Sequence, residues 1–253
     1  MHRPHRSRLT HYRRLFAKLA AHRRAGATDA ALGTLLAFIA GAINAGGFIA
    51  IGKYTSHMTG IISAVADDVA LGFFGAATIG LVLFVAFTAG AGCSAILINW
   101  GRRNFRARQY AYPLFAEAVL LLGFGAAGLL QPTTFVAVAA PLLCSIMGLQ
   151  NATITKISGA RVRTTHVTGM VTDIGIELGK LAYRTREDTP GRHPVVANLP
   201  RLSIHVRMVA MFFIGGVLGA LGFGHFGFGF SAVLAALVIV TVLPIIHLPR
   251  HSK

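Results

Sequence analysis

Two stretches of this chain carry the same polar residues in the same order within otherwise apolar sequence. Each combines an asparagine with hydroxyl side chains and a histidine, which are groups that hydrogen-bond a solute or relay a proton. They are Asn44, Thr55, Ser56, His57, Thr59 and Gly60 in the first stretch and Asn151, Thr164, Thr165, His166, Thr168 and Gly169 in the second. We predict that these residues bind a substrate.

The spacing of these residues indicates an internal repeat. Gly41-Ala42-Ile43-Asn44-Ala45 is matched 107 positions later by Gly148-Leu149-Gln150-Asn151-Ala152. Thr55-Ser56-His57-Met58-Thr59-Gly60 is matched 109 positions later by Thr164-Thr165-His166-Val167-Thr168-Gly169. In each copy the asparagine motif closes an apolar run, and the histidine motif opens a shorter one. Such a repeat predicts a duplicated architecture.

Hydroxyl residues stand just before both shorter runs, where helix N-caps belong. They are Thr55, Ser56, Thr164 and Thr165. As caps they would satisfy N–H groups of their own helices, but two converging helix N-termini would also favour an anionic or polar solute. The histidines either relay protons or lie neutral, hydrogen-bonded to Asn44 or Asn151. The asparagines either bind substrate or clamp breaks in the helices.

Acidic residues are few, and most lie in or beside apolar runs. We predict that Asp173, Glu177, Asp68 and Glu117 relay protons or a coupling ion, with Asp173 the first choice, because a carboxylate inside a membrane is costly. His166, Asp173, Glu177 and Lys180 share one side of a helix by their spacing. The alternatives are that Glu177 pairs with Lys180, that Asp67 and Asp68 cap a helix end at the surface, and that Glu117 partners a buried polar group.

Glycines recur near the same motifs. Gly41, Gly60, Gly148, Gly169 and the pair Gly215 and Gly219 fit the small-residue helix packing found in membranes. No His/Cys cluster has metal-ligand spacing, and no phosphate loop, dinucleotide fingerprint or nucleophile motif is present. We therefore predict no metal, no cofactor and no catalytic residue.

Composition defines the class of protein. Hydrophobic residues make up 54% of the chain and charged residues 13%, and the mean hydropathy is +0.63. Together with apolar runs near twenty residues long, these values indicate a membrane protein. The net charge of +16 is no sign of nucleic-acid binding, because the basic residues lie between apolar runs rather than on one soluble face.

The predicted fold is all-α. Long apolar runs cover 30–51, 73–99, 111–130, 133–154, 208–224 and 228–247, and shorter ones cover 55–71 and 165–181. A basic tail at 1–28 holds eight Lys/Arg and no acid, and a second tail covers 248–253. The first tail either contacts anionic lipid or only keeps the N-terminus in the cytoplasm.

Charge decides between two topologies. If every run crosses the membrane, the Arg102–Arg108 loop lies outside, against the positive-inside rule. If the two short runs are re-entrant or broken, the basic loops at 101–109, 155–163 and 184–207 lie inside with both termini. Of the 24 Lys/Arg only Lys53 is then outside, while Lys180 lies within the second short run. We predict this second scheme.

The second scheme has six transmembrane helices and two short re-entrant or broken helices. They form one membrane domain, 29–247, made of inverted repeats at about 29–130 and 133–247. Secondary transporters use such repeats, and their broken helices meet near the midplane. The alternative is a parallel repeat with eight spans.

These motifs resemble the YoaK-like family, a domain-of-unknown-function family of bacterial inner-membrane proteins often described as permeases. The resemblance rests on His57-Met58-Thr59-Gly60, Met147-Gly148-Leu149-Gln150-Asn151-Ala152 and Thr164-Thr165-His166-Val167-Thr168-Gly169 and covers about 30–247. The family commonly has an acid where Asn44 stands and an asparagine where Ile61 stands, so a coupling ion held by that acid is not implied here.

The leading hypothesis is a small-solute permease, a carrier or channel, of the bacterial inner membrane. Its solute, small and polar or anionic, would lie between the two short helices. Two alternatives remain: a non-transporting membrane scaffold or assembly factor, and an intramembrane enzyme that uses His57 or His166. The partners expected are the solute and the lipid bilayer, without nucleic acid.

Overall fold

The computed structural model describes residues 26–105, 108–159, 163–183 and 195–246, and this part of the chain is helical without strands. The elements are α2 (Gly26–Ile51), α3 (Met58–Ala70), α4 (Phe74–Asn104), α5 (Ala111–Ala127), α6 (Pro132–Ile157), α7 (Val167–Ala182), α8 (Leu199–Phe226), the 3₁₀ turn η2 (Gly227–Gly229) and α9 (Phe230–Ile246). The predicted all-α class is confirmed. The tail at 248–253 and residues 1–25 of the N-terminal tail lie outside the described residues.

Helix length and outer surface identify a membrane protein. Four helical stretches are long and apolar enough to cross a bilayer: Ala30–Ile51, Phe74–Asn104, Pro132–Ile157 and Leu199–Leu243. The last contains both α8 and most of α9, which the η2 turn separates. Large apolar side chains such as Ile96 and Phe213 face outwards and are 71% and 70% exposed, which is the surface that lipid covers.

Helix α8 begins earlier than the sequence suggests. The prediction of a loop to about 207 and a span from Met208 is wrong, because α8 starts at Leu199. The Asn198 side chain caps the helix by accepting the Arg201 N–H at 3.0 Å, and Pro200 suits the first turn. The polar residues of these first turns face α7, so the helix extends beyond its apolar part.

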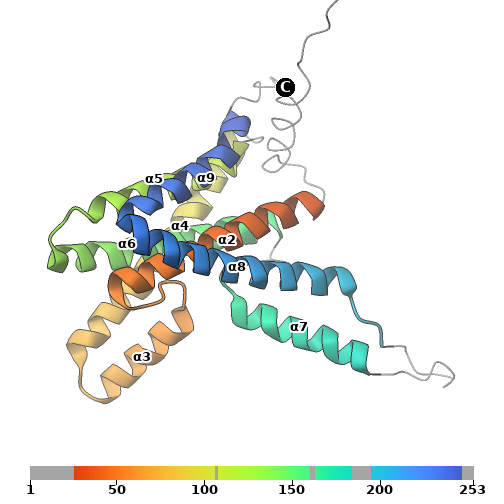
Figure 1. The fold of residues 1–253 in the computed structure, drawn as a ribbon, viewed down its shortest axis with the longest axis horizontal. Helices are drawn as coiled ribbons and strands as arrows, with labels where there is room; N and C mark the ends of the chain where they lie inside the picture. The colour runs from red at the N-terminus through yellow and green to blue at the C-terminus, as the bar shows by residue number, and fades with distance from the viewer. Residues whose placement is uncertain (1–25, 106–107, 160–162, 184–194, 247–253) are drawn as a thin grey trace, which may run out of the picture.

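The bundle is built from two long helix pairs, α2 with α8 and α4 with α6, and α5 packs on α9 (Figure 1). The backbones touch at glycines. A Cβ on Gly41 would stand 2.0 Å from the Phe212 carbonyl oxygen, and one on Gly215 would stand 1.9 Å from that of Phe38. The small-residue packing predicted for Gly41 and Gly215 is therefore found.

The other long pair makes the same contact. A Cβ on Gly148 would stand 1.9 Å from the Phe87 carbonyl oxygen, and one on Gly90 would stand 2.0 Å from that of Ser145. Gly148 follows Gly41 by 107 positions and Gly90 precedes Gly215 by 125. Each long pair thus meets at glycines from both helices, and in α8 the predicted Gly219 also takes part, because a Cβ there would stand 2.5 Å from Ala42 Cα.

The short helices α3 and α7 leave this bundle. α3 packs on α4 and α7 packs on α8. Their N-terminal ends lie next to each other near the centre of the molecule, and from there the two helices diverge (Figure 1). The prediction of two short helices, separate from the long ones, is correct in position and length.

The glycine contacts yield a test within one helix. Gly90→Ala forces α4 away from α6, and we expect it to lower the free energy of unfolding by about 1–3 kcal/mol. Gly92→Ala, two residues away, meets open space. It should leave stability unchanged or raise it by about 0.5–1 kcal/mol, because alanine favours helix. Thermal unfolding in detergent measures both variants, and equal effects would contradict the close contact.

Candidate functional site

Asparagine side chains fasten the loops that precede α3 and α7 to the long helices. Asn44 Oδ1 in α2 accepts the backbone N–H of Ser56 at 3.3 Å and its hydroxyl at 3.0 Å. Asn151 Oδ1 in α6 accepts the backbone N–H of Thr165 at 3.3 Å and the Thr164 hydroxyl at 3.3 Å. Asn151 Nδ2 also donates to the Thr165 hydroxyl. The asparagines thus clamp the breaks between the long and the short helices, which is one of their two predicted roles, and substrate binding by them stays a prediction.

The asparagine hydrogen bonds place the first turns of α3 and α7, which we call the openings of these helices, below the ends of α2 and α6. α2 ends at Ile51, as predicted, and α6 continues to Ile157, three residues beyond the predicted end, so both helices run on past their asparagine motifs. The seven residues after Asn44 and the six after Asn151 rise about 10 Å and 9 Å. Each loop therefore turns back before its short helix starts, which puts polar groups at a level where the long helices are still apolar.

The predicted hydroxyl caps are wrong. The N-cap residues of α3 and α7 are His57 and His166, and neither side chain bonds its own helix. Their imidazoles instead lie over the first turn. A Cβ on Gly60 would stand 2.2 Å from His57 Cδ2, and one on Gly169 would stand 2.1 Å from His166 Nε2.

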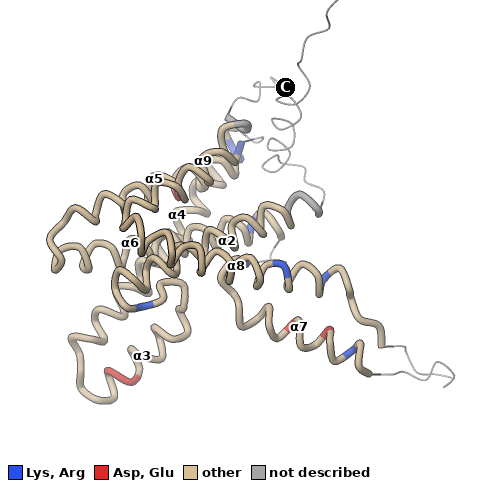
Figure 2. Tube along the Cα trace, viewed as in Figure 1, with Lys and Arg blue, Asp and Glu red and all other residues tan. Residues whose placement is uncertain are grey.

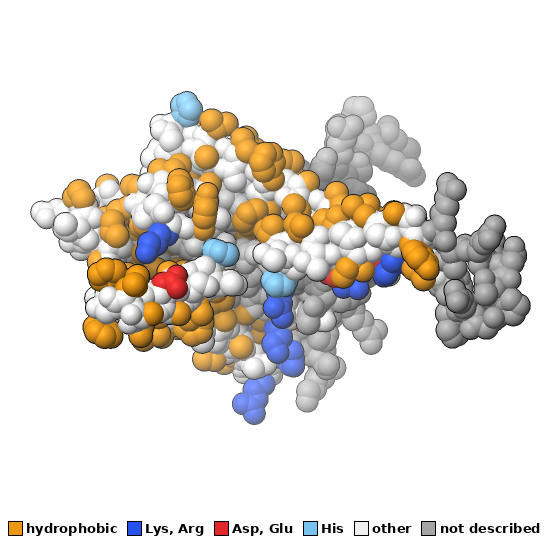
Figure 3. Space-filling model, turned by 90° about the horizontal axis from the view of Figure 1, so that it is seen from below, with side chains coloured by type: hydrophobic (Ala, Val, Ile, Leu, Met, Phe, Trp, Pro, Cys, Tyr) orange, Lys and Arg blue, Asp and Glu red, His pale blue; other side chains and the backbone are white. Residues whose placement is uncertain are grey.

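The glycine three residues after each histidine is thus required by the ring, and not by contact between helices as the sequence suggested. Within the described chain neither imidazole is hydrogen-bonded to Asn44 or Asn151, so that alternative is also wrong. Thr59 and Thr168 lie exposed in the same first turns. Histidine side chains come to the surface near the middle of the face in Figure 3, where α3 and α7 begin.

A buried polar chain continues from the second opening into the bundle. The Thr164 hydroxyl donates to Gln150 Oε1 at 3.0 Å, and Gln150 Nε2 donates to Glu117 Oε1 at 2.7 Å. All three residues are 0% exposed. The prediction that Glu117 partners a buried polar group is confirmed, while its predicted role in relaying protons stays open.

Sequence reasoning missed Gln150, although the two copies differ there. Ile43 occupies the matching place in the first copy. Thr55, which matches Thr164, is buried, and its hydroxyl oxygen has no hydrogen-bond partner in the described part of the chain. The polar chain is therefore a property of the second copy.

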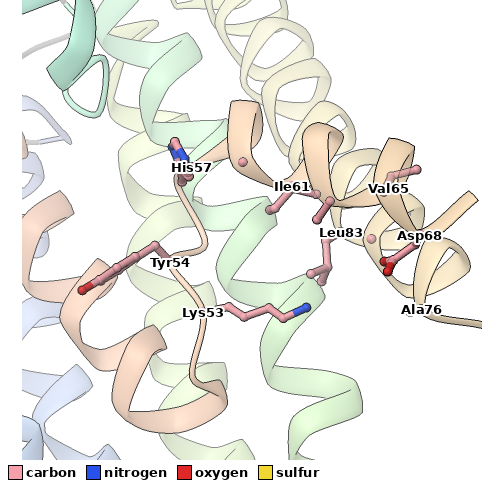
Figure 4. Close-up of a pocket in the computed structure, with 11 residues that line it drawn as sticks. Lys53, Tyr54, His57, Ile61, Val65, Asp68, Ala76 and Leu83 are labelled. Carbon is pink, nitrogen blue, oxygen red and sulfur yellow. The ribbon is translucent and has the colours of Figure 1, made fainter. Parts of the chain in front are cut away.

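A pocket of about 230 Å³ lies between α3, α4 and the preceding loop (Figure 4). His57 and Gly60 border it at the opening of α3, and Asp68 borders it near the end of that helix. Lys53 reaches from the loop towards the side that carries Asp68 (Figure 4). In the sequence, Lys53 is notable only as an exception to the positive-inside rule. The alternative predicted for Asp68 was that it caps a helix end, and its side chain lines the pocket instead.

Charged side chains occupy the matching position along α7. Arg201 Nη2 donates to both Asp173 carboxylate oxygens at 3.1 Å, and His205 Nδ1 lies 3.7 Å from Asp173 Oδ2. Asp173 stands 109 positions after Ala64, the spacing of the histidine motifs, and Arg201 and His205 stand 125 positions after Ala76 and Gly80, the spacing of Gly90 and Gly215; Ala64, Ala76 and Gly80 line the pocket beside α3. The second copy thus holds an ion pair where the first is hollow.

Glu177 pairs with Lys180, as the alternative for this residue predicted. Lys180 Nζ donates to Glu177 Oε1 at 2.9 Å, and the Asn198 N–H donates to Glu177 Oε2 at 2.7 Å. Glu177 therefore holds the start of α8 against α7. His166 stays apart from these acids at the opening. No group of His, Cys, Asp or Glu that could hold a metal ion occurs among the residues that the structure describes.

This arrangement defines an all-helical membrane protein in which two short helices pack beside the long ones and a chain of polar side chains is buried among α5, α6 and the loop before α7. The family model described as "Protein of unknown function (DUF1275)" matches residues 32–245, and the chain belongs to this family. The match confirms the resemblance to the YoaK-like family. No curated protein and no solved structure matches the chain.

The asparagine clamp can be tested at Asn151. Asn151→Ala removes the acceptor of the Thr165 N–H and of the Thr164 hydroxyl, and we expect a loss of about 1–3 kcal/mol in stability, with faster amide exchange at 163–166. Asn151→Asp keeps both acceptor bonds and should have the smaller effect. Exchange at 54–57, in the first copy, is the internal control. Unchanged exchange in Asn151→Ala would contradict the clamp.

Proposed function

We propose that this protein is a permease of the bacterial inner membrane that moves a small polar or anionic solute past the facing openings of α3 and α7. The observation that carries the proposal is the pair of clamped loops, which hold polar groups beside apolar helices. Non-helical backbone at membrane depth is tolerated where protein or water surrounds it. A water-filled path between the two openings satisfies that requirement. A protein that serves only as a scaffold does not need such a path.

In this proposal six helices span the membrane: α2, α4, α5, α6, α8 and α9. The short helices are re-entrant: the segment with α3 enters and leaves the membrane on one side, and the segment with α7 does so on the other. The 17-residue helices α5 and α9 are just long enough. With the exception of the loop before α3, which carries Lys53, the Lys and Arg residues lie towards one end of the bundle (Figure 2). That end is then cytoplasmic, with both termini.

The reciprocal contacts support two inverted repeats, about 29–130 and 133–247. Gly41 of α2 meets α8 as Gly148 of α6 meets α4, so each half of the chain packs its first long helix on the third helix of the other half. A two-fold axis relating the halves produces such an exchange, and the distribution of Lys and Arg favours an axis in the membrane plane. The openings of α3 and α7 then reach the middle of the membrane from opposite sides.

The groups at the openings select the solute class. The first N–H groups of α3 and α7 lack a side-chain cap, and Thr59, Thr168 and the imidazoles stand around them. Helix N-termini favour negative charge, and Lys53 adds a cation beside the first opening. A small solute with an anionic or strongly polar group fits these donors.

The two halves differ in a way that fits alternating access. The pocket beside α3 is open, while Asp173, Arg201 and His205 fill its counterpart beside α7. In the proposed orientation, the solute path is open to the outside and the charged cluster closes the cytoplasmic side. Opening that side requires the ion pair to separate.

A cysteine at Ala64, in the wall of the pocket, tests the water path. In a variant that lacks Cys93 and Cys144, we expect Ala64→Cys to react with a membrane-impermeant thiol reagent added outside intact cells. Because Lys53 and Asp68 both line the pocket, Lys53→Gln should slow the reaction with a sulfonate reagent several-fold relative to its ammonium analogue. Labelling is measured by mass shift of the purified protein.

Ala66→Cys, on the same helix but away from the pocket, is the matched control and should stay unlabelled in lipid. Equal labelling at both positions would mean that α3 lies outside the membrane. Labelling at neither would favour a scaffold without a water path.

The ion pair at the other side is tested with Arg201→Ala, which restores the residue found at Ala76. With a reporter cysteine at Ile174, we expect reagent added to the cytoplasmic face of inverted vesicles to react only after this change. The Arg201 and Asp173 side chains are 53% and 31% exposed, so the pair contributes less than about 1 kcal/mol and the fold is retained. Arg207→Ala removes a nearby charge and should have no effect. Labelling of Ile174→Cys with Arg201 intact would show that this side is already open.

A further inference from the structure

Glu117 stands out among the buried groups of this protein. It lies in α5, is 0% exposed, and receives one hydrogen bond, from Gln150 Nε2 at 2.7 Å. Its second oxygen, Oε2, is buried and has no hydrogen-bond partner in the described part of the chain. An ionised carboxylate there lacks a cation, and a protonated one lacks an acceptor for its O–H.

The elements around Glu117 supply no compensating charge. α5 itself adds only Tyr112, and α9 and η2 hold no titratable residue in their described lengths. α6 carries Cys144 and, at its end, Lys156. α4 carries Cys93, Arg102 and Arg103, and Arg102 Nε donates to Gln109 instead. A buried carboxylate without a partner in a membrane protein points to a group that gains and loses an ion.

The geometry selects a proton as that ion. A sodium or divalent cation needs a shell of several oxygen ligands, and here the Gln150 oxygen is occupied by the Thr164 hydroxyl. A proton needs a single oxygen. Glu117 is six residues from the start of α5, about 9 Å along the helix, which is close enough to that end for exchange with water through a short chain of solvent.

We propose that Glu117 binds and releases one proton, and that Gln150 passes this change to the opening of α7. With the carboxylate ionised, the Gln150 amide donates to Glu117 and accepts from Thr164. When a proton from water forms an O–H bond at Glu117, that O–H seeks the amide oxygen, and the amide turns over. Thr164 then faces an N–H donor, and its own hydroxyl hydrogen goes wholly to Asn151 Oδ1, 3.3 Å away.

This inference deepens the proposed function by adding proton coupling at the cytoplasmic opening. The first copy lacks the chain, because Ile43 stands in place of Gln150. The opening of α3 still carries His57 at the place of His166, so the exchange at 54–60 is a matched internal reference. A response to Glu117 appears at α7 alone.

The experiment combines two readouts on purified protein in lipid nanodiscs. Infrared difference spectroscopy against pH should show the carbonyl stretching band of a protonated carboxyl, and Glu117→Gln should lose it. Amide hydrogen exchange at 163–169, normalised to 54–60, should change several-fold across the same pH range. Both Glu117→Gln and Gln150→Ile should lose that change, and Gln150→Ile should keep the infrared band.

The proposal is overturned if no carboxyl band titrates, or if Glu117→Gln leaves it in place. It is equally overturned if the exchange at 163–169 keeps its pH dependence in Glu117→Gln, which would assign the change to His166, Asp173 or another group. Gln150→Ile copies the first repeat, and Glu117→Gln is isosteric, so a folded variant is available for each step. Neither readout needs a solute, so failure here leaves the labelling test of the permease separate.

Discussion

This architecture depends on hydrogen bonds between an asparagine side chain in an apolar helix and the backbone of the loop that follows. Backbone that turns back within a membrane carries N–H groups that lipid cannot satisfy. Asn44 and Asn151 accept such N–H groups from Ser56 and Thr165 and so fix where each short helix starts. These two acceptors hold the loops against the long helices and thereby fix the positions of the openings of α3 and α7.

Glycine contacts set the frame around the clamps. In lipid, helices gain little from burying apolar surface, and close backbone contact takes its place. Gly41, Gly90, Gly148 and Gly215 each meet a carbonyl group of a neighbouring helix. The long pairs are thereby closely packed, while α3 packs mainly on α4 and α7 mainly on α8. Such a division suits a protein in which the short helices and their pockets change and the long pairs stay.

The two copies have diverged in charge more than in shape. Beside α3 the chain has Ala64, Ala76 and Gly80, and a pocket remains open. Beside α7 it has Asp173, Arg201 and His205, and Gln150 links the opening to Glu117. We interpret this difference as a division of labour in which the opening of α3 admits the solute, the charged cluster beside α7 closes the path, and Glu117 of α5 senses protons through Gln150. Each part of that interpretation is a proposal.

The sequence by itself determined the helical membrane class, the two short helices and the residues worth attention, because apolar run length and a repeated motif are local properties of the chain. It also predicted the pairing of Glu177 with Lys180, which are neighbours on one helix turn. Only the tertiary structure decided that the rings of His57 and His166 lie over the first turns of the short helices without capping them, that α8 starts at Leu199, and that Gln150, Lys53 and Arg201 belong to the candidate site. Those outcomes depend on contacts between segments far apart in the chain, whose geometry no local pattern records.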